Sequence, residues 1–232
     1  MLPLASRTVP GRWLAPMVLA AWVAGGAAAI GQVAGDAFLA WSRRDAADIV
    51  ANMRRTDSVG NRMSFRGLKT DRAISYKLRA TWLTPDVIRA TARAIQLDER
   101  LSPADARRLV EEAEAAADTV FFVEIDPNEG SGIIPLDWMA ILQPRGLPRG
   151  EAGAARGVLA PTLRDVRALG GLFKRDYAYD AFWVSFRFTP EERTVLFGPG
   201  ATEVELVVSI QGREGIVSWP VPGAMRDRPG PR

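Results

Sequence analysis

A stretch of 23 residues without one charged side chain, Trp13–Gly35, most constrains how this chain folds and where it resides. Arg7 and Arg12 precede it, an apolar run covers 13–23, and small residues fill 24–29. A basic leader, an apolar run and a small-residue stretch, in that order, are typical of a secretory signal. A segment of this length is also long enough to cross a bilayer as a helix. Residues 1–35 are therefore predicted to be a signal peptide or a membrane anchor.

The following residues bear on the choice between these two alternatives. Ala27 and Ala29 fit the small-residue requirement of a cleavage site before Ile30. Apolar side chains at helical spacing from Leu39 to Met53 favour instead an anchor helix that continues as a juxtamembrane helix, with residues 54–73 as a polar linker. A third alternative places the apolar segment in the protein core. The first two place the later residues outside the cytosol, in the cell envelope: a cleaved signal predicts a secreted protein, and an anchor predicts one held in the inner membrane.

The absence of two residue types excludes several chemistries. The chain has no cysteine and no histidine, so it forms no disulfide, thiol nucleophile or Ser-His-Asp triad. Without residues 1–29 the 30 basic residues fall to 28 against 27 acidic ones, a net charge of +1. Because basic and acidic side chains are interspersed, nucleic acid is not an expected partner. Arginines far outnumber lysines, a bias typical of GC-rich bacterial genomes.

Hydrophobic periodicity predicts one folded domain over residues 74–222. Residues 74–82 alternate as a half-buried strand does. Thr84-Pro85 and Ser102-Pro103 each offer an N-cap followed by a first-turn proline, which predicts a helical hairpin over 84–117. Further strands are expected at 119–125, 136–142, 176–188, 204–210 and 216–219, with a loop at 143–161, a short helix from 162 and a disordered tail at 223–232.

These elements predict the fold class. Strands outnumber helices, and they recur on both sides of the hairpin. We therefore expect an α+β or mainly-β domain, an antiparallel sheet or sandwich with the helical hairpin inserted after the first strand.

The acidic turn at 126–134 has two interpretations. Asp126, Asn128 and Asp137 have the spacing of positions 1, 3 and 12 of a calcium-binding loop. Gly130 and Ser131 break that pattern, and no helices flank the segment. The alternative is a plain turn, in which proline, asparagine and glycine adopt the required dihedral angles.

Carboxylates near this turn raise a second chemical hypothesis. Glu124, Asp126, Glu129 and Asp137 are candidates for the carboxylate pair of a glycoside hydrolase. No nucleophile elbow, Walker motif or Ser-x-x-Lys pattern accompanies them.

An aromatic row on one strand is the candidate binding surface. Tyr177, Tyr179 and Trp183 share one parity, opposite to that of Phe182, Val184, Phe186 and Phe188. If the phenylalanines face the core, the row faces a ligand or packs beneath the helical hairpin.

The sequence favours a non-catalytic envelope domain that binds a protein or a glycan, or has a structural role. An extracytoplasmic, carboxylate-dependent glycan hydrolase, with or without calcium, is the alternative.

Overall fold

The computed structural model describes residues 36–60, 75–128, 132–146, 153–170 and 178–227. The chain divides into two compact units, Met1–Ala37 and Phe38–Arg232. The predicted signal or anchor at 1–35 lies outside the described residues. No helix within the described ranges is both long enough and apolar enough to cross a membrane.

The second unit is built on two antiparallel sheets. Sheet A has the strand order β1-β2-β3-β7-β6 and sheet B the order β5-β4-β8-β9. The prediction of a sheet-rich α+β fold with antiparallel sheets is therefore confirmed. The strands are β1 Arg54–Val59, β2 Tyr76–Trp82, β3 Thr119–Pro127, β4 Met139–Pro144, β5 Ala155–Arg156, β6 Val158–Leu159, β7 Asp180–Phe186, β8 Glu203–Ile210 and β9 Arg213–Pro220.

The two sheets meet along both edges. On one side β1 lies against β9, where the Gly60 N–H donates to the Glu214 carbonyl at 3.1 Å. On the other side the chain crosses from sheet B to sheet A at Gly157, between β5 and β6. A Cβ on Gly157 would lie 2.4 Å from Val184 Cγ1, so this crossing requires glycine.

The core between the sheets follows the alternation of the strands. Leu78 and Trp82 of β2, Phe121 and Val123 of β3, and Phe186 of β7 all point into it. They face residues of sheet B that include Leu206, Val208 and Trp219. The two antiparallel sheets therefore share one apolar core between their inner faces.

Tyr76 places a hydroxyl in this core without a hydrogen bond. Its side chain is fully buried, and its hydroxyl has no partner among the described residues. Burial raises the pKa of Tyr76 above its ordinary value of 10.0, and the positive charge of Arg213 opposes the rise in part. A buried polar group without a partner costs stability.

We expect Tyr76→Phe to raise the free energy of unfolding by about 1 kcal/mol near neutral pH. Above about pH 10 the unfolded state loses the tyrosine proton before the folded state does, so the wild type loses stability as the pH rises. Phenylalanine has no hydroxyl to ionise, so the stability of Tyr76→Phe does not fall with pH for this reason. Urea unfolding of both proteins at pH 7 and in a series above pH 9 measures both effects, and equal stability at every pH would refute them.

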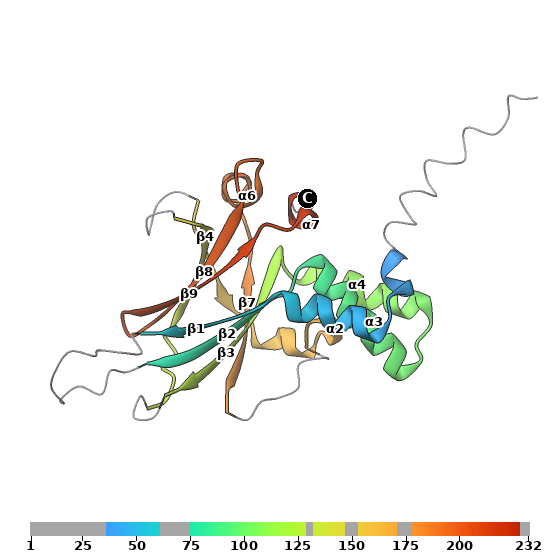
Figure 1. The fold of residues 1–232 in the computed structure, drawn as a ribbon, viewed down its shortest axis with the longest axis horizontal. Helices are drawn as coiled ribbons and strands as arrows, with labels where there is room; N and C mark the ends of the chain where they lie inside the picture. The colour runs from blue at the N-terminus through green and yellow to red at the C-terminus, as the bar shows by residue number, and fades with distance from the viewer. Residues whose placement is uncertain (1–35, 61–74, 129–131, 147–152, 171–177, 228–232) are drawn as a thin grey trace, which may run out of the picture. The chain divides into compact units, whose positions relative to one another are not determined.

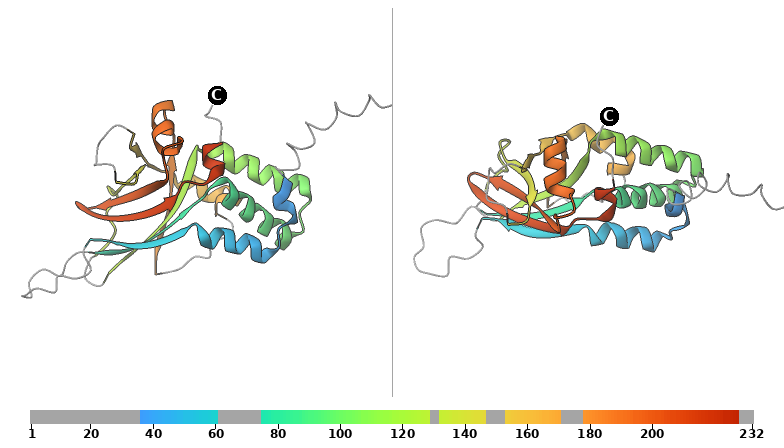
Figure 2. Two further views of the ribbon diagram at one scale, coloured as in Figure 1. Left: turned by 45° about the horizontal axis from the view of Figure 1, so that its top comes forward. Right: turned by 90° about the horizontal axis from the view of Figure 1, so that it is seen from above.

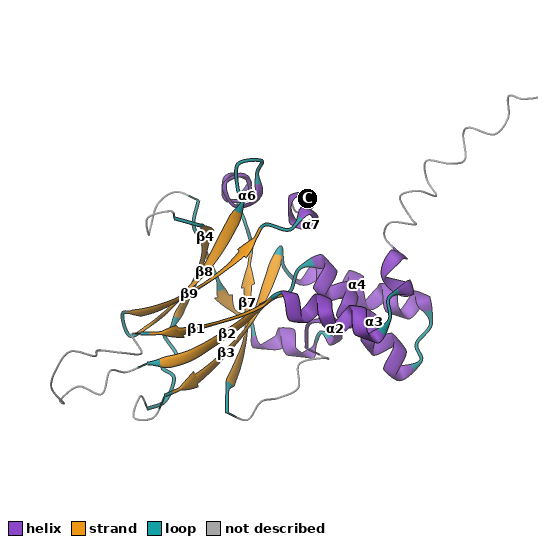
Figure 3. Cartoon of the chain, in the orientation of Figure 1, coloured by secondary structure: helices purple, strands orange, loops and turns teal. Residues whose placement is uncertain are grey.

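Helices α2 Arg43–Asn52, α3 Pro85–Glu99 and α4 Pro103–Ala116 lie beside one end of β1, β2 and β3, whereas α6 Pro190–Phe197 lies apart from them (Figure 1). Figure 3 separates the helices from the strands by colour. The rotated views keep α2, α3 and α4 together at that end (Figure 2). The helices are η1 Ala37–Ala40, α2 Arg43–Asn52, α3 Pro85–Glu99, α4 Pro103–Ala116, η2 Pro161–Asp165, α5 Arg167–Gly170, α6 Pro190–Phe197 and α7 Gly223–Arg226.

The predicted helical hairpin is confirmed as α3 and α4. The Thr84 hydroxyl accepts from the Val87 N–H, the Ser102 hydroxyl accepts from the Asp105 N–H, and each cap is followed by proline. The hairpin lies beside the end of sheet A at which β2 ends and β3 begins. Its apolar side chains form a second core with Val120 and Phe122 of β3.

Two sequence predictions need correction. Residues 54–59, predicted as linker, form β1, so the hairpin follows the second strand rather than the first. Only Val59 of this strand is buried, and the other five residues are polar. Residues 223–226, predicted as disordered tail, form α7, where Met225 is buried. Residues 228–232 lie outside the described ranges.

Two other segments differ in detail. The strand expected at 136–142 begins at Met139, after a turn in which Leu136 is exposed. Within the loop expected at 143–161, residues 155–156 and 158–159 pair as β5 and β6.

Candidate functional site

The outer face of sheet A divides into an apolar part and a polar part. On β3, Val120 and Phe122 pack against the helices, whereas Glu124 and Asp126 lie farther along the same face. The alternation of the strand places these four even-numbered residues on one face, and only the first two of them reach the helices. The polar part holds the carboxylates that the sequence suggests for catalysis.

Each of these two carboxylates lies opposite a cation on β2. Glu124 is 3% exposed, and its Oε1 accepts from Arg79 Nη1 at 3.1 Å. Arg54 Nη2 of β1 lies 3.9 Å from Glu124 Oε2. Asp126 Oδ2 accepts from Lys77 Nζ at 2.6 Å. Both carboxylates are therefore held in ion pairs along the sheet, and the cations of these pairs compensate their negative charge.

The residues proposed for calcium have other neighbours. Asp126 is bound to Lys77, and the Asn128 side-chain amide donates to Ser75 Oγ at 2.8 Å. Asp137 is exposed in the turn before β4. Glu129 lies outside the described residues. Within the described ranges no three acidic, histidine or cysteine side chains gather to hold a metal, and the calcium hypothesis stays a prediction.

The aromatic row of β7 is split between different environments. Tyr177 lies outside the described residues. The Tyr179 ring is half-buried, with the Arg79 guanidinium carbon 4.3 Å from its centroid. Trp183 Nε1 donates to the Leu169 carbonyl of α5 at 3.0 Å, and its ring lies 4.9 Å from that of Phe122. Trp183 is half-buried, which leaves part of its indole accessible.

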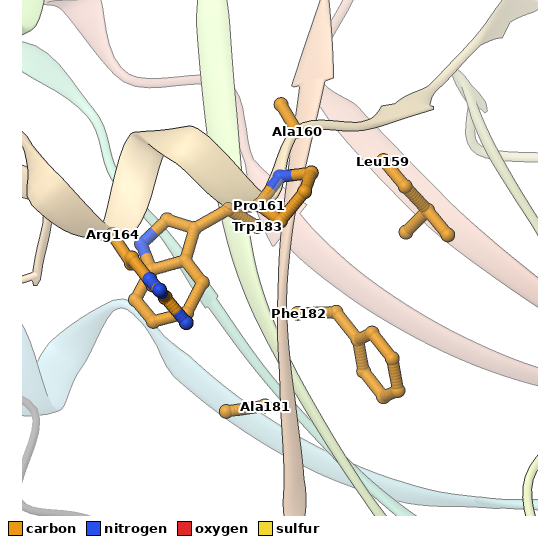
Figure 4. A pocket seen from close by; sticks show the side chains of 7 residues that line it. All are labelled: Leu159, Ala160, Pro161, Arg164, Ala181, Phe182 and Trp183. Carbon is orange, nitrogen blue, oxygen red and sulfur yellow. The ribbon is translucent and has the colours of Figure 1, made fainter.

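A pocket of about 250 Å³ lies against Trp183 (Figure 4). Figure 4 shows Ala181 and Trp183 on one side of β7 and Phe182 on the other. Since residues of both parities line it, the pocket runs along the edge of the strand. Its lining residues are Leu159, Ala160, Pro161, Arg164, Ala181, Phe182 and Trp183.

The pocket is apolar apart from one cation. Arg164 Nε lies 3.4 Å from Asp165 Oδ1, and the two side chains are 69% and 74% exposed. An ion pair this exposed contributes little, so the Arg164 guanidinium is available to an anion. The arrangement suits a ligand that combines an apolar group with a carboxylate.

Sequence reasoning identified Trp183 but missed the opposite wall of the pocket. Leu159, Pro161 and Arg164 fall in or after the segment predicted as loop. Val158 and Leu159 form a strand of only two residues, which is too short for its pattern to be recognised, and Pro161 indicates only that a strand does not continue there.

A second pocket of about 290 Å³ lies between α2 and α3. Three of its six lining residues are alanines, and the others are Arg43, Val50 and Arg54. Arg43 forms an ion pair with Asp98, and Arg54 lies near Glu124.

No family model, curated protein or solved structure matches the chain.

Proposed function

We propose that the chain is an exported or membrane-anchored envelope protein whose residues 38–232 form a non-catalytic binding domain. The pocket at Trp183 carries this proposal. It joins a partly accessible indole, apolar walls and one exposed guanidinium at the edge of a sheet. Aromatic and arginine side chains of this kind dominate the energetics of protein recognition.

The membrane part of the proposal rests on the uncharged segment Trp13–Gly35 and the basic residues before it. Cell fractionation followed by N-terminal sequencing tests this part. We expect the protein in the envelope fraction, beginning either at Met1 or near Ile30. A full-length protein in the cytosol would overturn the localisation and leave the pocket untouched.

The chemistry of the pocket favours a protein partner over a glycan. Sugar hydroxyls need several hydrogen-bonding side chains, and Arg164 is the one charged side chain among the lining residues. Apolar side chains of a partner gain from burial against Trp183 on one side of β7 and against Leu159 on the other. The hydrolase alternative has less support, because Glu124 and Asp126 are both engaged in ion pairs.

A selection from a random peptide library tests the binding site. The full-length protein, held in detergent, selects peptides whose Kd is then measured for surface variants. We expect Arg164→Glu and Leu159→Ser each to weaken binding about tenfold or more, because they reverse the one charge and remove an apolar wall. Arg108→Glu and Ile216→Ser are the matched controls, since both residues are exposed and lie outside the pocket.

The controls decide the outcome. Selected peptides that bind wild type, Arg164→Glu and Leu159→Ser with equal Kd would refute the pocket as the binding site. Failure of the library to yield any binder would count against the proposal in the same way.

A further inference from the structure

The edge of β7 is only partly covered by β6. Val158 and Leu159 pair with Ser185 and Val184, and the Ala160 N–H donates to the Trp183 carbonyl at 2.8 Å. The chain then turns away at Pro161 into η2. Among the described residues, no strand continues the line of β6 beside Asp180–Phe182.

Ala181 directs its backbone groups to this uncovered edge. In an antiparallel strand, alternate residues point both the N–H and the C=O to the same side. The Trp183 carbonyl points towards the side of β6, so the Ala181 N–H and C=O point there too. No backbone partner of Ala181 on that side lies among the described residues. One donor and one acceptor therefore face the pocket that Ala181 lines.

The pocket occupies the position that β6 vacates. One wall is β7 from Ala181 to Trp183, and the other is the segment Pro161–Arg164. The residues that line the pocket therefore offer the Ala181 N–H and C=O together with apolar side chains on both sides of β7. An extended peptide satisfies both at once, because its backbone pairs with an edge while its alternate side chains enter pockets.

We propose that the partner binds by strand addition, with an extended segment placed along Asp180–Phe182 as a continuation of β6. Its backbone exchanges hydrogen bonds with Ala181, successive apolar side chains lie against Trp183 on one side of β7 and against Leu159 and Phe182 on the other, and a carboxylate meets Arg164. This inference rests on the proposed function, since it specifies how the partner occupies the same pocket.

The geometry favours a peptide segment of another protein over a second copy of this chain. The open edge is about three residues long, and in each copy it is bounded by that copy's own β6 and η2. Two copies paired through β7 would meet over this short stretch only. A single extended peptide segment has no β6 or η2 of its own that would block its approach to the edge. The exposed Arg164 complements an acidic residue on such a segment.

Proline at the edge is the decisive substitution. Ala181→Pro removes the N–H offered to the peptide, and an edge strand tolerates proline where the N–H faces outward. We expect this variant to bind the selected peptides at least about tenfold more weakly. Ala181→Ser keeps the N–H and is the matched control, with an expected change below about threefold. Near-UV circular dichroism and Tm verify that both variants fold.

Backbone methylation of the peptide tests the same bonds from the other side and does not depend on the fold of any variant. N-methylation at alternate positions, those facing Ala181, is expected to weaken binding to wild type about tenfold. Methylation at the intervening positions is expected to have little effect.

The outcomes separate the two proposals. Binding that depends on Arg164 and Leu159 but is unaffected by Ala181→Pro and by every N-methylation would overturn strand addition and leave the pocket as the binding site. Binding that depends on none of them would overturn both. A concentration-dependent dimer in sedimentation, abolished by Ala181→Pro, would assign the edge to a second copy and overturn the peptide proposal.

Discussion

Asp118→Ala is expected to lower the free energy of unfolding by about 3–5 kcal/mol, because it removes one partner of a buried ion pair. Asp118 is 6% exposed, and its Oδ1 lies 3.3 Å from Arg193 Nη2 of α6. Its Oδ2 accepts from the Phe188 N–H at 2.8 Å. The residue lies between α4 and β3, so this one carboxylate ties the end of the hairpin to α6.

Further variants separate the charge from the hydrogen bond. Asp118→Asn retains an acceptor for the Phe188 N–H but leaves Arg193 without this opposite charge, and we expect an intermediate loss. The double variant Asp118→Ala, Arg193→Leu is expected to recover part of the stability, because no buried charge is stranded. Asp165→Ala, which breaks the exposed pair with Arg164, is the control and should change stability by less than about 1 kcal/mol. Urea unfolding measures all four, and a loss at Asp118 no larger than that at Asp165 would contradict the assignment.

Local patterns predicted most of the secondary structure. The alternation in 74–82 and 204–210 corresponds to β2 and β8, and the Ser/Thr-Pro caps correspond to α3 and α4. The same cap pattern occurs at Thr189-Pro190, where it begins α6 with a full capping box. That helix was overlooked although its signal was present.

The strands that were missed carry little periodic signal. β1 buries one side chain of six and lies along β9, so its polar sequence resembles a linker. β5 and β6 are two residues long, which is shorter than any window in which alternation can be recognised. Such elements form because a neighbouring strand offers an edge, and one segment's own sequence does not contain that information.

The candidate site was predictable only in part. The outward face of β7 follows from parity, which is how Trp183 was identified. The ion pairs of Glu124 and Asp126 depend on the register between β2 and β3, which brings Arg79 opposite Glu124 across 45 residues of sequence. The wall formed by Pro161 and Arg164 depends on where β6 ends. Both features depend on contacts between segments far apart in the sequence. The carboxylates Glu124 and Asp126, which suggested catalysis, are the ones that form the ion pairs.

The second large effect is expected at Trp82, where three aromatic rings meet one indole. Trp82 is fully buried, and its ring centroid lies 5.4 Å from that of Phe121, 6.1 Å from that of Trp219 and 6.2 Å from that of Phe197. It thereby joins sheet A, sheet B and α6. Trp82→Ala should lower the free energy of unfolding by about 3–5 kcal/mol, because it leaves a cavity between elements that cannot collapse independently.

A smaller change at the same position isolates the contribution of the indole hydrogen bond to stability. Trp82 Nε1 donates to Thr119 Oγ1 at 2.6 Å in a buried setting. Trp82→Phe keeps an aromatic ring but strands the Thr119 hydroxyl, which should cost about 1–2 kcal/mol beyond the loss of ring volume. Adding Thr119→Val to Trp82→Phe removes the stranded hydroxyl and should restore part of that loss. If the double variant is no more stable than Trp82→Phe in urea unfolding, the hydrogen bond contributes nothing and ring packing alone accounts for the effect of Trp82→Ala.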